Sequence, residues 1–346
     1  MKVTRRRFIS TITMAFSGCS TEVGGPGWSS EGLSRADTLA RGHGGQGWGG
    51  WIGRRRQFGW NLDARGPVLS ITKALAALAA TRAAGEKWLS ADERVAETVP
   101  EWRSDPNKSR ITVLMLLQQT AGLEAGVAAL YRNPGDKGKR ALGLRIIDTP
   151  GTKFRYGPAC WEVLAELLHR KLVARGQTLE KFLDRSVLAK VGISSPAWRS
   201  DRLGRFYLST GAELSVEDLA RLGRTLGKLL EGDNADGFEA SQFARMTEPS
   251  RINPMFGGGL WRNVNARKGG AFSAEIEDAL DPAPPTAFWQ RACLSTIQPA
   301  EMVALIGSSG RRVFIWPSEH RVVARLGRAR SWEDGPFLRE LSAWSR

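Results

Sequence analysis

The sequence predicts one α+β domain with antiparallel strands in its C-terminal third and helices in its middle. Apolar residues recur at helical spacing through the middle of the chain, whereas the C-terminal third holds short β-branched runs separated by turn residues. Residues 51–60 add a candidate pair of short strands with arginines at the turn. Because strands lie on both sides of a helical middle, segments far apart in the sequence have to close the sheet.

Length and composition indicate a globular protein with a large core. The chain has 346 residues, of which 42% are hydrophobic and 25% charged, which excludes a disordered tail, a collagen-like chain and a small disulfide-stapled scaffold. The net charge of +15 favours an anionic surface, such as an envelope polymer, a lipid headgroup or nucleic acid. Three cysteines are too few for a disulfide framework and lack metal-ligand spacing.

The N-terminus has the pattern of an export signal. Thr4-Arg5-Arg6-Arg7-Phe8-Ile9-Ser10 follows the order of a twin-arginine signal, and the short apolar stretch behind it is too short to span a membrane. Phe16-Ser17-Gly18 before Cys19 resembles the lipidation box of a bacterial lipoprotein. We therefore expect residues 1–19 to be a signal peptide and the protein to be periplasmic or anchored to the membrane through Cys19. The alternative is a basic N-terminus of a cytoplasmic protein.

The segment that follows is expected to be a tether. Residues 20–50 are rich in glycine and show little periodicity, which is typical of a flexible linker between an anchor and a folded body. The folded domain is then expected to cover residues 51–346.

Four segments in the middle of the chain are predicted as helices. The first begins at Ser70 and stops at Gly85, and the second follows Thr112 as its cap and ends at Gly122. The third covers about 160–173. The fourth starts at a capping box formed by Ser215 and Asp218.

The C-terminal third is predicted to contain loop and strands. Segment 262–298 has little periodicity and a proline cluster, so we expect it to be mostly loop. Residues 302–306, 312–316 and 321–326 are short, β-branched and separated by turns, as in antiparallel strands. A final helix is expected over 332–344.

A candidate nucleophile lies at the start of the first predicted helix. Ser70-Ile71-Thr72-Lys73 is an S-x-x-K tetrad, of which about one is expected by chance in a chain of this composition. Its position places Ser70 and Lys73 one helical turn apart on one face, and the helix N-terminus favours a negatively charged oxygen there. A partly desolvated lysine with a lowered pKa can act as the base that a serine hydroxyl needs.

Several further blocks occur in the same order as in a known family. They are Pro67–Lys73; Ile111-Thr112 with Leu116-Leu117, Thr120 and Gly122-Leu123; Pro150–Tyr156; and Gly211 with Ser215 and Asp218–Ala220. Over about residues 60–330 the chain resembles the β-lactamase-related serine hydrolases, which include class C β-lactamases, D-alanyl-D-alanine peptidases and esterase relatives. The resemblance implies a β-lactamase/transpeptidase-like fold, in which an antiparallel sheet is flanked by helices and joined to a mostly helical subdomain.

The resemblance also implies roles for particular residues. Ser70 would be the acyl-forming nucleophile, Lys73 its proton acceptor, and Tyr156 the tyrosine that moves protons between Lys73, Ser70 and the leaving group. Ser308-Ser309-Gly310 best matches the third motif, which lies on a strand. The backbone N–H groups of Ser70 and Arg311 would then form the oxyanion hole.

Two positions depart from the family pattern. Pro158 stands where the family usually has Asn, and Ser308 stands where it usually has Lys or His to hold a substrate carboxylate. Arg311 or Arg312 is a candidate replacement for that cation. Both departures remove recognition groups but leave Ser70, Lys73 and Tyr156 in place. They therefore count against β-lactamase and carboxypeptidase activity more than against hydrolysis as such.

The sequence thus predicts a serine hydrolase that cleaves an ester or amide through an acyl-enzyme on Ser70, without metal or organic cofactor. The substrate class is a small-molecule or peptide-like ester or amide, with peptidoglycan as a further candidate, and no nucleic acid is expected. The alternatives are a D-alanyl-D-alanine carboxypeptidase or penicillin-binding protein, and a catalytically silent ligand-binding module of the same fold. The histidines, His43, His169 and His320, have no zinc-binding spacing and no context that supports a Ser-His-Asp triad.

Overall fold

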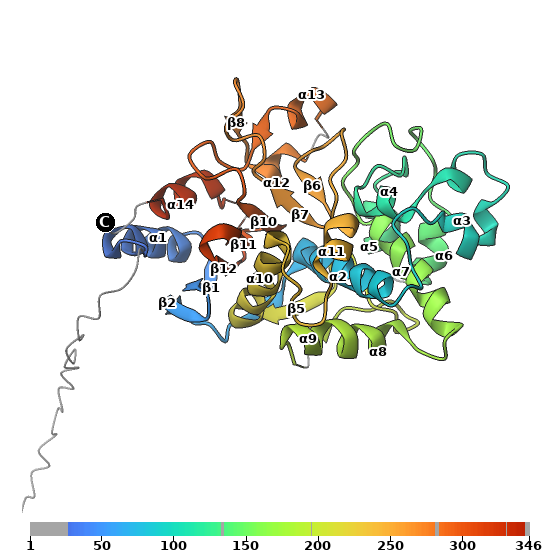
Figure 1. Cartoon of the computed structure of the whole chain (residues 1–346), viewed down its shortest axis with the longest axis horizontal. Coiled ribbons are helices and arrows are strands. Elements are labelled where there is room, and N and C mark those ends of the chain that lie inside the picture. The colour runs from blue at the N-terminus through green and yellow to red at the C-terminus, as the bar shows by residue number, and fades with distance from the viewer. Residues whose placement is uncertain (1–26, 133–134, 195, 281–283, 330, 343–346) are drawn as a thin grey trace, which may run out of the picture.

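The computed structural model describes residues 27–132, 135–194, 196–280, 284–329 and 331–342. Its largest element is a seven-stranded antiparallel sheet in the order β2-β1-β12-β11-β10-β7-β6 (Figure 1). The strands are β1 (Gly45–Ile52), β2 (Arg55–Trp60), β6 (Phe256–Gly257), β7 (Leu260–Arg262), β10 (Val303–Gly307), β11 (Arg311–Trp316) and β12 (Arg321–Gly327). Two smaller sheets consist of β3 (Arg65–Pro67), β5 (Ala212–Ser215) and β4 (Ala197–Trp198), and of β8 (Phe272–Ser273) with β9 (Ala292–Cys293).

The helices form a group of their own beside the sheet and also cover its two faces (Figure 1). They are α1 (Ser30–Gly42), α2 (Thr72–Gly85), α3 (Val95–Thr98), α4 (Val113–Leu117), α5 (Val127–Tyr131), α6 (Lys137–Leu142), α7 (Ala159–Val173), α8 (Leu179–Leu183), α9 (Ala189–Val191), α10 (Val216–Glu231), α11 (Ala240–Met246), α12 (Ile276–Ala279), α13 (Thr286–Trp289) and α14 (Asp334–Glu340). The α+β class and the flanked antiparallel sheet are therefore confirmed.

Distant segments close the sheet, as predicted. β1 pairs with β12 from Gly45↔Gly327 to Ile52↔Arg321, so the start and the end of the domain form adjacent strands. Alternate side chains face opposite sides of a strand. On one side, Gly223 of α10 lies against Val313 and Val322. On the other, Phe337 of α14 contacts Phe314 at 6.2 Å between ring centroids.

The prediction of a flexible tether over residues 20–50 is wrong for its described part. Residues 30–42 form α1, and the glycine-rich stretch from Gly45 onward is strand β1. The glycines there allow close approach: a Cβ atom on Gly47 would lie 2.3 Å from the Asn61 carbonyl oxygen, and one on Gly50 would lie 2.8 Å from the Trp28 ring. Residues 20–26 and the predicted signal peptide with Cys19 lie outside the described residues.

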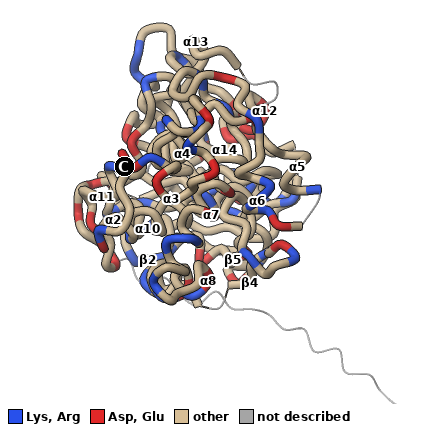
Figure 2. The backbone as a smooth tube through the Cα atoms, turned by 90° about the vertical axis from the view of Figure 1, so that its right-hand side faces the viewer, with Lys and Arg blue, Asp and Glu red and all other residues tan. Residues whose placement is uncertain are grey.

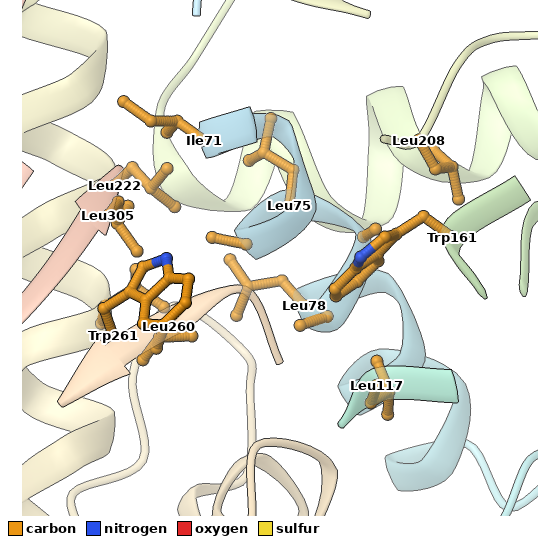
Figure 3. Packing of buried hydrophobic residues seen from close by; sticks show 14 of the residues in the cluster. Ile71, Leu75, Leu78, Leu117, Trp161, Leu208, Leu222, Leu260, Trp261 and Leu305 are labelled. Atoms are coloured by element: carbon orange, nitrogen blue, oxygen red, sulfur yellow. The ribbon is translucent and has the colours of Figure 1, made fainter. Parts of the chain in front are cut away.

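Helix α2 occupies the centre of the molecule. All of its residues are buried except Arg82 and Gly85, because its alanine-rich sequence suits a helix that is covered on every side. Figure 3 shows Leu75 and Leu78 between Leu222 and Leu305 on one side and Trp161 and Leu117 on the other. The helix thus joins the sheet to the helical subdomain.

Most of the predicted elements are present with shifted ends. Thr112 caps α4 and Ser215 caps α10 through a capping box with Asp218, as predicted. The predicted extension of the second helix to Gly122 is wrong: α4 ends at Leu117, and Gln119 adopts a left-handed φ of 54°. The final helix is shorter than predicted and covers Asp334–Glu340, with residues 343–346 outside the described part.

The charge is spread over the molecule. Figure 2 shows basic and acidic residues interspersed along the backbone of the face that carries α3 to α7, instead of one continuous basic surface. Within the described residues, no helix combines the length and apolar character that crossing a bilayer requires.

Candidate active site

Ser70 lies in a short 3₁₀ turn, η1 (Leu69–Ile71), directly before α2. Two contacts with β5 hold this turn: the Val68 N–H donates to the Ala212 carbonyl at 2.9 Å, and the Ala212 N–H donates to the Thr72 hydroxyl at 3.1 Å. Leu69 has a left-handed φ of 50°, which is unfavourable for a residue with a side chain. Such strained residues cluster at functional sites, where the surrounding structure holds them.

Lys73 reaches back from the first turn of α2 to Ser70. Its Nζ lies 2.8 Å from the Ser70 Oγ and 2.9 Å from the Ser209 carbonyl oxygen. The side chain is 2% exposed, and this burial lowers the pKa of Lys73 to about 7, with the negative charge of Glu162 opposing the shift. A substantial fraction of Lys73 is therefore neutral near pH 7 and able to accept a proton from Ser70.

Tyr156 completes the group that the sequence predicted. Its hydroxyl is hydrogen-bonded to Ser70, and its ring lies 4.9 Å from the Lys73 Nζ. Burial raises the pKa of Tyr156 well above its usual range, while the hydrogen bond to Ser70 acts in the opposite direction. Tyr156 therefore stays protonated at neutral pH and can donate a hydrogen bond or a proton.

The loop that carries Tyr156 is fixed by Gln119 and Ala125. The Gly157 N–H donates to the Gln119 Oε1 at 2.7 Å, and the Arg155 N–H donates to the Gln119 carbonyl at 2.9 Å. A Cβ atom on Gly157 would lie 2.5 Å from the Ala125 carbonyl oxygen, so only glycine fits there without displacement. This explains locally why a glycine follows the tyrosine.

Pro158 begins α7 at its N-cap and brings no polar group to the site. The Lys73 ammonium instead has the Ser209 carbonyl as its second partner. Sequence reasoning missed Ser209, because a main-chain carbonyl leaves no trace in residue type. The only signal nearby is the block at Gly211.

The prediction that Ser308 and Gly310 lie on a strand is wrong. They belong to the turn that joins β10 to β11, where Ser309 and Gly310 have φ values of 62° and 75°. Arg311 is the first residue of β11 and pairs with Gly307 of β10. Gly307 lies against the η1 region, since a Cβ atom there would be 2.3 Å from the Val68 carbonyl oxygen. The β10–β11 hairpin therefore borders the turn that holds Ser70.

Both arginines proposed as a replacement cation are already engaged. Arg311 donates to the carbonyls of Pro67 and Ser308 at 2.5 and 2.6 Å. Arg312 is 1% exposed and forms an ion pair with Asp334 at 2.7 Å. These contacts direct both guanidinium groups toward oxygen atoms of the protein itself.

A cavity of about 520 Å³ lies beside the tyrosine. Phe154 and Trp289 line it, together with Pro284 and Pro285 from the predicted loop region. Lys153, Arg155 and Thr286 complete the lining, and the Phe154 ring is 6.4 Å from the Tyr156 ring. The apolar part of the wall suits an apolar portion of a substrate.

Within the described residues, no histidine, cysteine or metal-binding cluster belongs to the group formed by Ser70, Lys73 and Tyr156. His320 pairs with Glu231 on α10 at 3.2 Å, and Cys160 and Cys293 are buried free thiols. Across the described ranges, no three histidine, cysteine, aspartate or glutamate side chains gather in a geometry that could hold a metal ion.

The chain is similar to one protein family in sequence and to several solved structures in fold. The family model described as Beta-lactamase matches residues 31–293. No curated protein matches the chain significantly.

Among solved structures, three similar ones differ in their described activity. A penicillin-binding protein homologue from Caulobacter crescentus is 17% identical with a TM-score of 0.61, and the match covers 93% of this chain and 98% of that one. A family VIII carboxylesterase is 17% identical with a TM-score of 0.63, covering 93% and 99%. A D-stereospecific amidohydrolase from Streptomyces sp. is 16% identical with a TM-score of 0.62, covering 89% and 98%. At these identities the likeness establishes the shared fold.

Proposed function

Because the chain belongs to the Beta-lactamase family, we propose that it is a serine hydrolase that forms an acyl-enzyme on Ser70. The observation that carries this proposal is the contact of 2.8 Å between the Ser70 Oγ and a buried lysine whose pKa is lowered to about 7. A solvated lysine would be protonated at neutral pH and could not act as a base. Burial of Lys73 removes that obstacle.

The residues support an acyl-transfer sequence in two halves. The Ser70 Oγ attacks the substrate carbonyl carbon while its proton passes to the Lys73 Nζ, giving a tetrahedral oxyanion. The Ser70 N–H and an N–H of the β10–β11 hairpin would stabilise that oxyanion. The C–O or C–N bond then breaks, and Tyr156 delivers the proton from Lys73 to the leaving group. Water attacks the acyl-enzyme in the second half, with Lys73 as acceptor of its proton. The bond between the acyl carbon and the Ser70 Oγ then breaks, the acid is released, and Lys73 returns the proton to the Ser70 Oγ.

The arrangement favours a neutral ester or amide over a substrate with a free carboxylate. Ser308 carries no charge, and Arg311 and Arg312 already bind carbonyl and carboxylate oxygens. A carboxylate at the site would therefore lack an available cation from these three residues. The proposed substrate class is an acyl ester or amide with an apolar part that fits against Phe154 and Trp289.

The proposed location is the cell envelope, on the strength of the twin-arginine pattern in residues 4–10 and of Cys19. Lipid attached to Cys19 would tether the domain to a membrane, and peptidoglycan would then be within reach as a partner. Fractionation of cells that express the wild type and the variants Arg6→Lys/Arg7→Lys and Cys19→Ser tests this. Export lost in the first and membrane association lost in the second are expected. Unchanged fractionation in both would contradict it.

Burst kinetics with a substrate panel test the catalytic proposal. The purified chain is mixed with short p-nitrophenyl esters, a D-alanyl-D-alanine peptide and benzylpenicillin. We expect a burst of nitrophenol close to one per active protein molecule, followed by slower turnover, and no burst from Ser70→Ala. Release of D-alanine with a stable penicillin adduct would favour the peptidase alternative. Absence of turnover of every substrate by folded protein would favour the silent binding module.

A further inference from the structure

A buried ion pair is connected to Lys73 through Ser209. The Lys137 Nζ of α6 is 2.8 Å from the Glu162 Oε2 of α7, and the two side chains are 2% and 0% exposed. Burying two charges costs several kcal/mol per ion before their attraction is counted, and apolar residues of similar size are often as stable. Stability alone is therefore a weak explanation for this pair.

The second oxygen of Glu162 fixes the residue that contacts Lys73. The Glu162 Oε1 accepts hydrogen bonds from the Ser209 N–H at 2.9 Å and from the Ser209 hydroxyl at 2.6 Å. Tyr131 donates its hydroxyl proton to the Ser209 Oγ at 3.3 Å. The Ser209 carbonyl in turn accepts from the Lys73 Nζ at 2.9 Å. A continuous chain of contacts therefore links Lys137, Glu162, Ser209 and Lys73.

We propose that Glu162 and Lys137 are positioning residues that hold the Ser209 carbonyl against Lys73 and so keep its Nζ directed at Ser70. The proposal rests on the proposed function, since it concerns the base of that reaction. In this arrangement Ser209 supplies the polar contact for which Pro158 has no side-chain group. Lys137 neutralises Glu162, so the site gains a fixed acceptor without an unbalanced buried carboxylate.

The charge of Glu162 also acts on Lys73 without touching it. Burial lowers the pKa of Lys73, and Glu162 raises it. The other groups that face Lys73 are the hydroxyl of Ser70 and the ring of Tyr156, and beyond Ser209 lie the hydroxyl of Tyr131 and the ammonium group of Lys137. Arg199 lies further out, over the rings of Tyr131 and Tyr207 at 5.8 and 4.8 Å. Glu162 is therefore the negative charge whose removal changes the proton affinity of Lys73 most directly.

The test is the pH dependence of Ser70 labelling by a fluorophosphonate probe in the wild type and in Glu162→Gln. Glutamine keeps the shape and an acceptor oxygen for Ser209 but removes the charge. We expect the midpoint of the labelling rate to move to lower pH by about 0.5 to 1 unit, because the protonated form of Lys73 loses a nearby anion. We also expect a lower limiting rate.

A matched control lies one turn further along α7. Glu166 is 7% exposed and pairs with Arg170 at 2.8 Å and Arg205 at 2.9 Å, away from Ser209. Glu166→Gln also removes a buried carboxylate from α7, so it is expected to reduce thermal stability while leaving the midpoint in place. A merely structural role for Glu162 predicts the same result for both variants.

A double variant keeps the test valid if Glu162→Gln fails to fold with Lys137 unpaired. Glu162→Gln/Lys137→Met removes a negative and a positive charge together, so its midpoint is expected to move less than that of Glu162→Gln, whereas the lower limiting rate is kept because Ser209 still loses its charged acceptor. With a wild type that labels normally, an unchanged midpoint in folded Glu162→Gln, or an unchanged limiting rate where only the double variant folds, would overturn the positioning role. A wild type that does not label would instead overturn the proposed function, so the two failures are distinguishable.

Discussion

At the scale of single residues, the proposed base Lys73 carries a cost to stability. An ammonium group in a buried site is unfavourable, and the fold places it there beside Ser70. Residues of this kind exemplify the trade-off between activity and stability. Removing the amine should therefore abolish catalysis and stabilise the protein.

We predict that Lys73→Met raises the melting temperature by roughly 2–5 °C at pH 7. The lysine has a pKa of about 7 in the folded chain and 10.5 in the unfolded chain. Between these values the unfolded state binds more protons, so the wild type gains stability as pH rises, and the burial penalty is complete below pH 7. The advantage of Lys73→Met should therefore be largest at pH 7 and below and shrink toward pH 10.

Thermal unfolding at pH 6, 7, 8.5 and 10 measures this difference. Lys153→Met serves as control, because that side chain is 63% exposed and pairs with Asp148 at the surface. Its difference from the wild type should not change between pH 7 and 10. A destabilised Lys73→Met at pH 7, or a difference that grows with pH, would contradict the burial argument.

The residues that could be predicted are those within short motifs. Ser70, Lys73 and Tyr156 stand in blocks of fixed spacing, and the structure brings them together. Glu162 and Lys137 could not be predicted, because the fold alone makes them neighbours and no spacing links them to Ser209. The third motif, Ser308-Ser309-Gly310, was wrongly predicted to lie on a strand. Its residues have small side chains, and in sequence such a hairpin turn resembles the end of a strand.

At the scale of elements, the junction between the Tyr156 loop and α7 shows how packing sets the site. Gly157 lies against the Ala125 backbone, and its N–H is bound by Gln119. The contacts of Gly157 with Ala125 and Gln119 therefore fix the position of the loop, in which the Tyr156 hydroxyl is hydrogen-bonded to Ser70.

We predict that Gly157→Ala lowers the rate of ester turnover at least tenfold and destabilises the protein by about 1–3 kcal/mol. The added methyl group would lie 2.5 Å from the Ala125 carbonyl oxygen and 2.9 Å from its Cα, so the loop has to shift. Steady-state kinetics and thermal unfolding measure the two effects. Gly42→Ala is the control, because nothing lies within 4 Å of a Cβ atom there. Equal behaviour of the two variants would refute the steric account.

Helices and strands were predicted correctly where the apolar periodicity was strong. The prediction failed where glycine-rich sequence was interpreted as a flexible tether. The capped helix at Ser215 and the strands near 303–307 and 321–327 follow directly from the pattern. In β1 the same glycines serve close packing against Trp28, Trp51 and Asn61. Composition alone does not distinguish a tether from a strand whose neighbours need that space.

At the scale of the whole molecule, the sheet and the helical subdomain meet at α2. The N-terminal end of α2 holds Lys73, η1 in front of it holds Ser70, and the β10–β11 hairpin lies beside that turn. Tyr156 and Ser209 come from the helical subdomain and its connection to β5. The candidate site therefore lies where the sheet and the helical subdomain meet, and its residues come from distant parts of the chain. This explains why motifs spread in order over most of the chain predicted both the fold and the grouping of Ser70, Lys73 and Tyr156.

The most direct test of the central claim is to map the adduct of a fluorophosphonate probe on the purified, folded chain by peptide mass spectrometry. The account predicts one labelled residue, Ser70, with no labelling in Ser70→Ala and unchanged labelling in Ser308→Ala, since the Ser308 side chain is exposed and uncharged. A folded wild type that takes up no probe, or a Ser70→Ala variant that is still labelled at the wild-type rate, would contradict the assignment of Ser70 as an activated nucleophile.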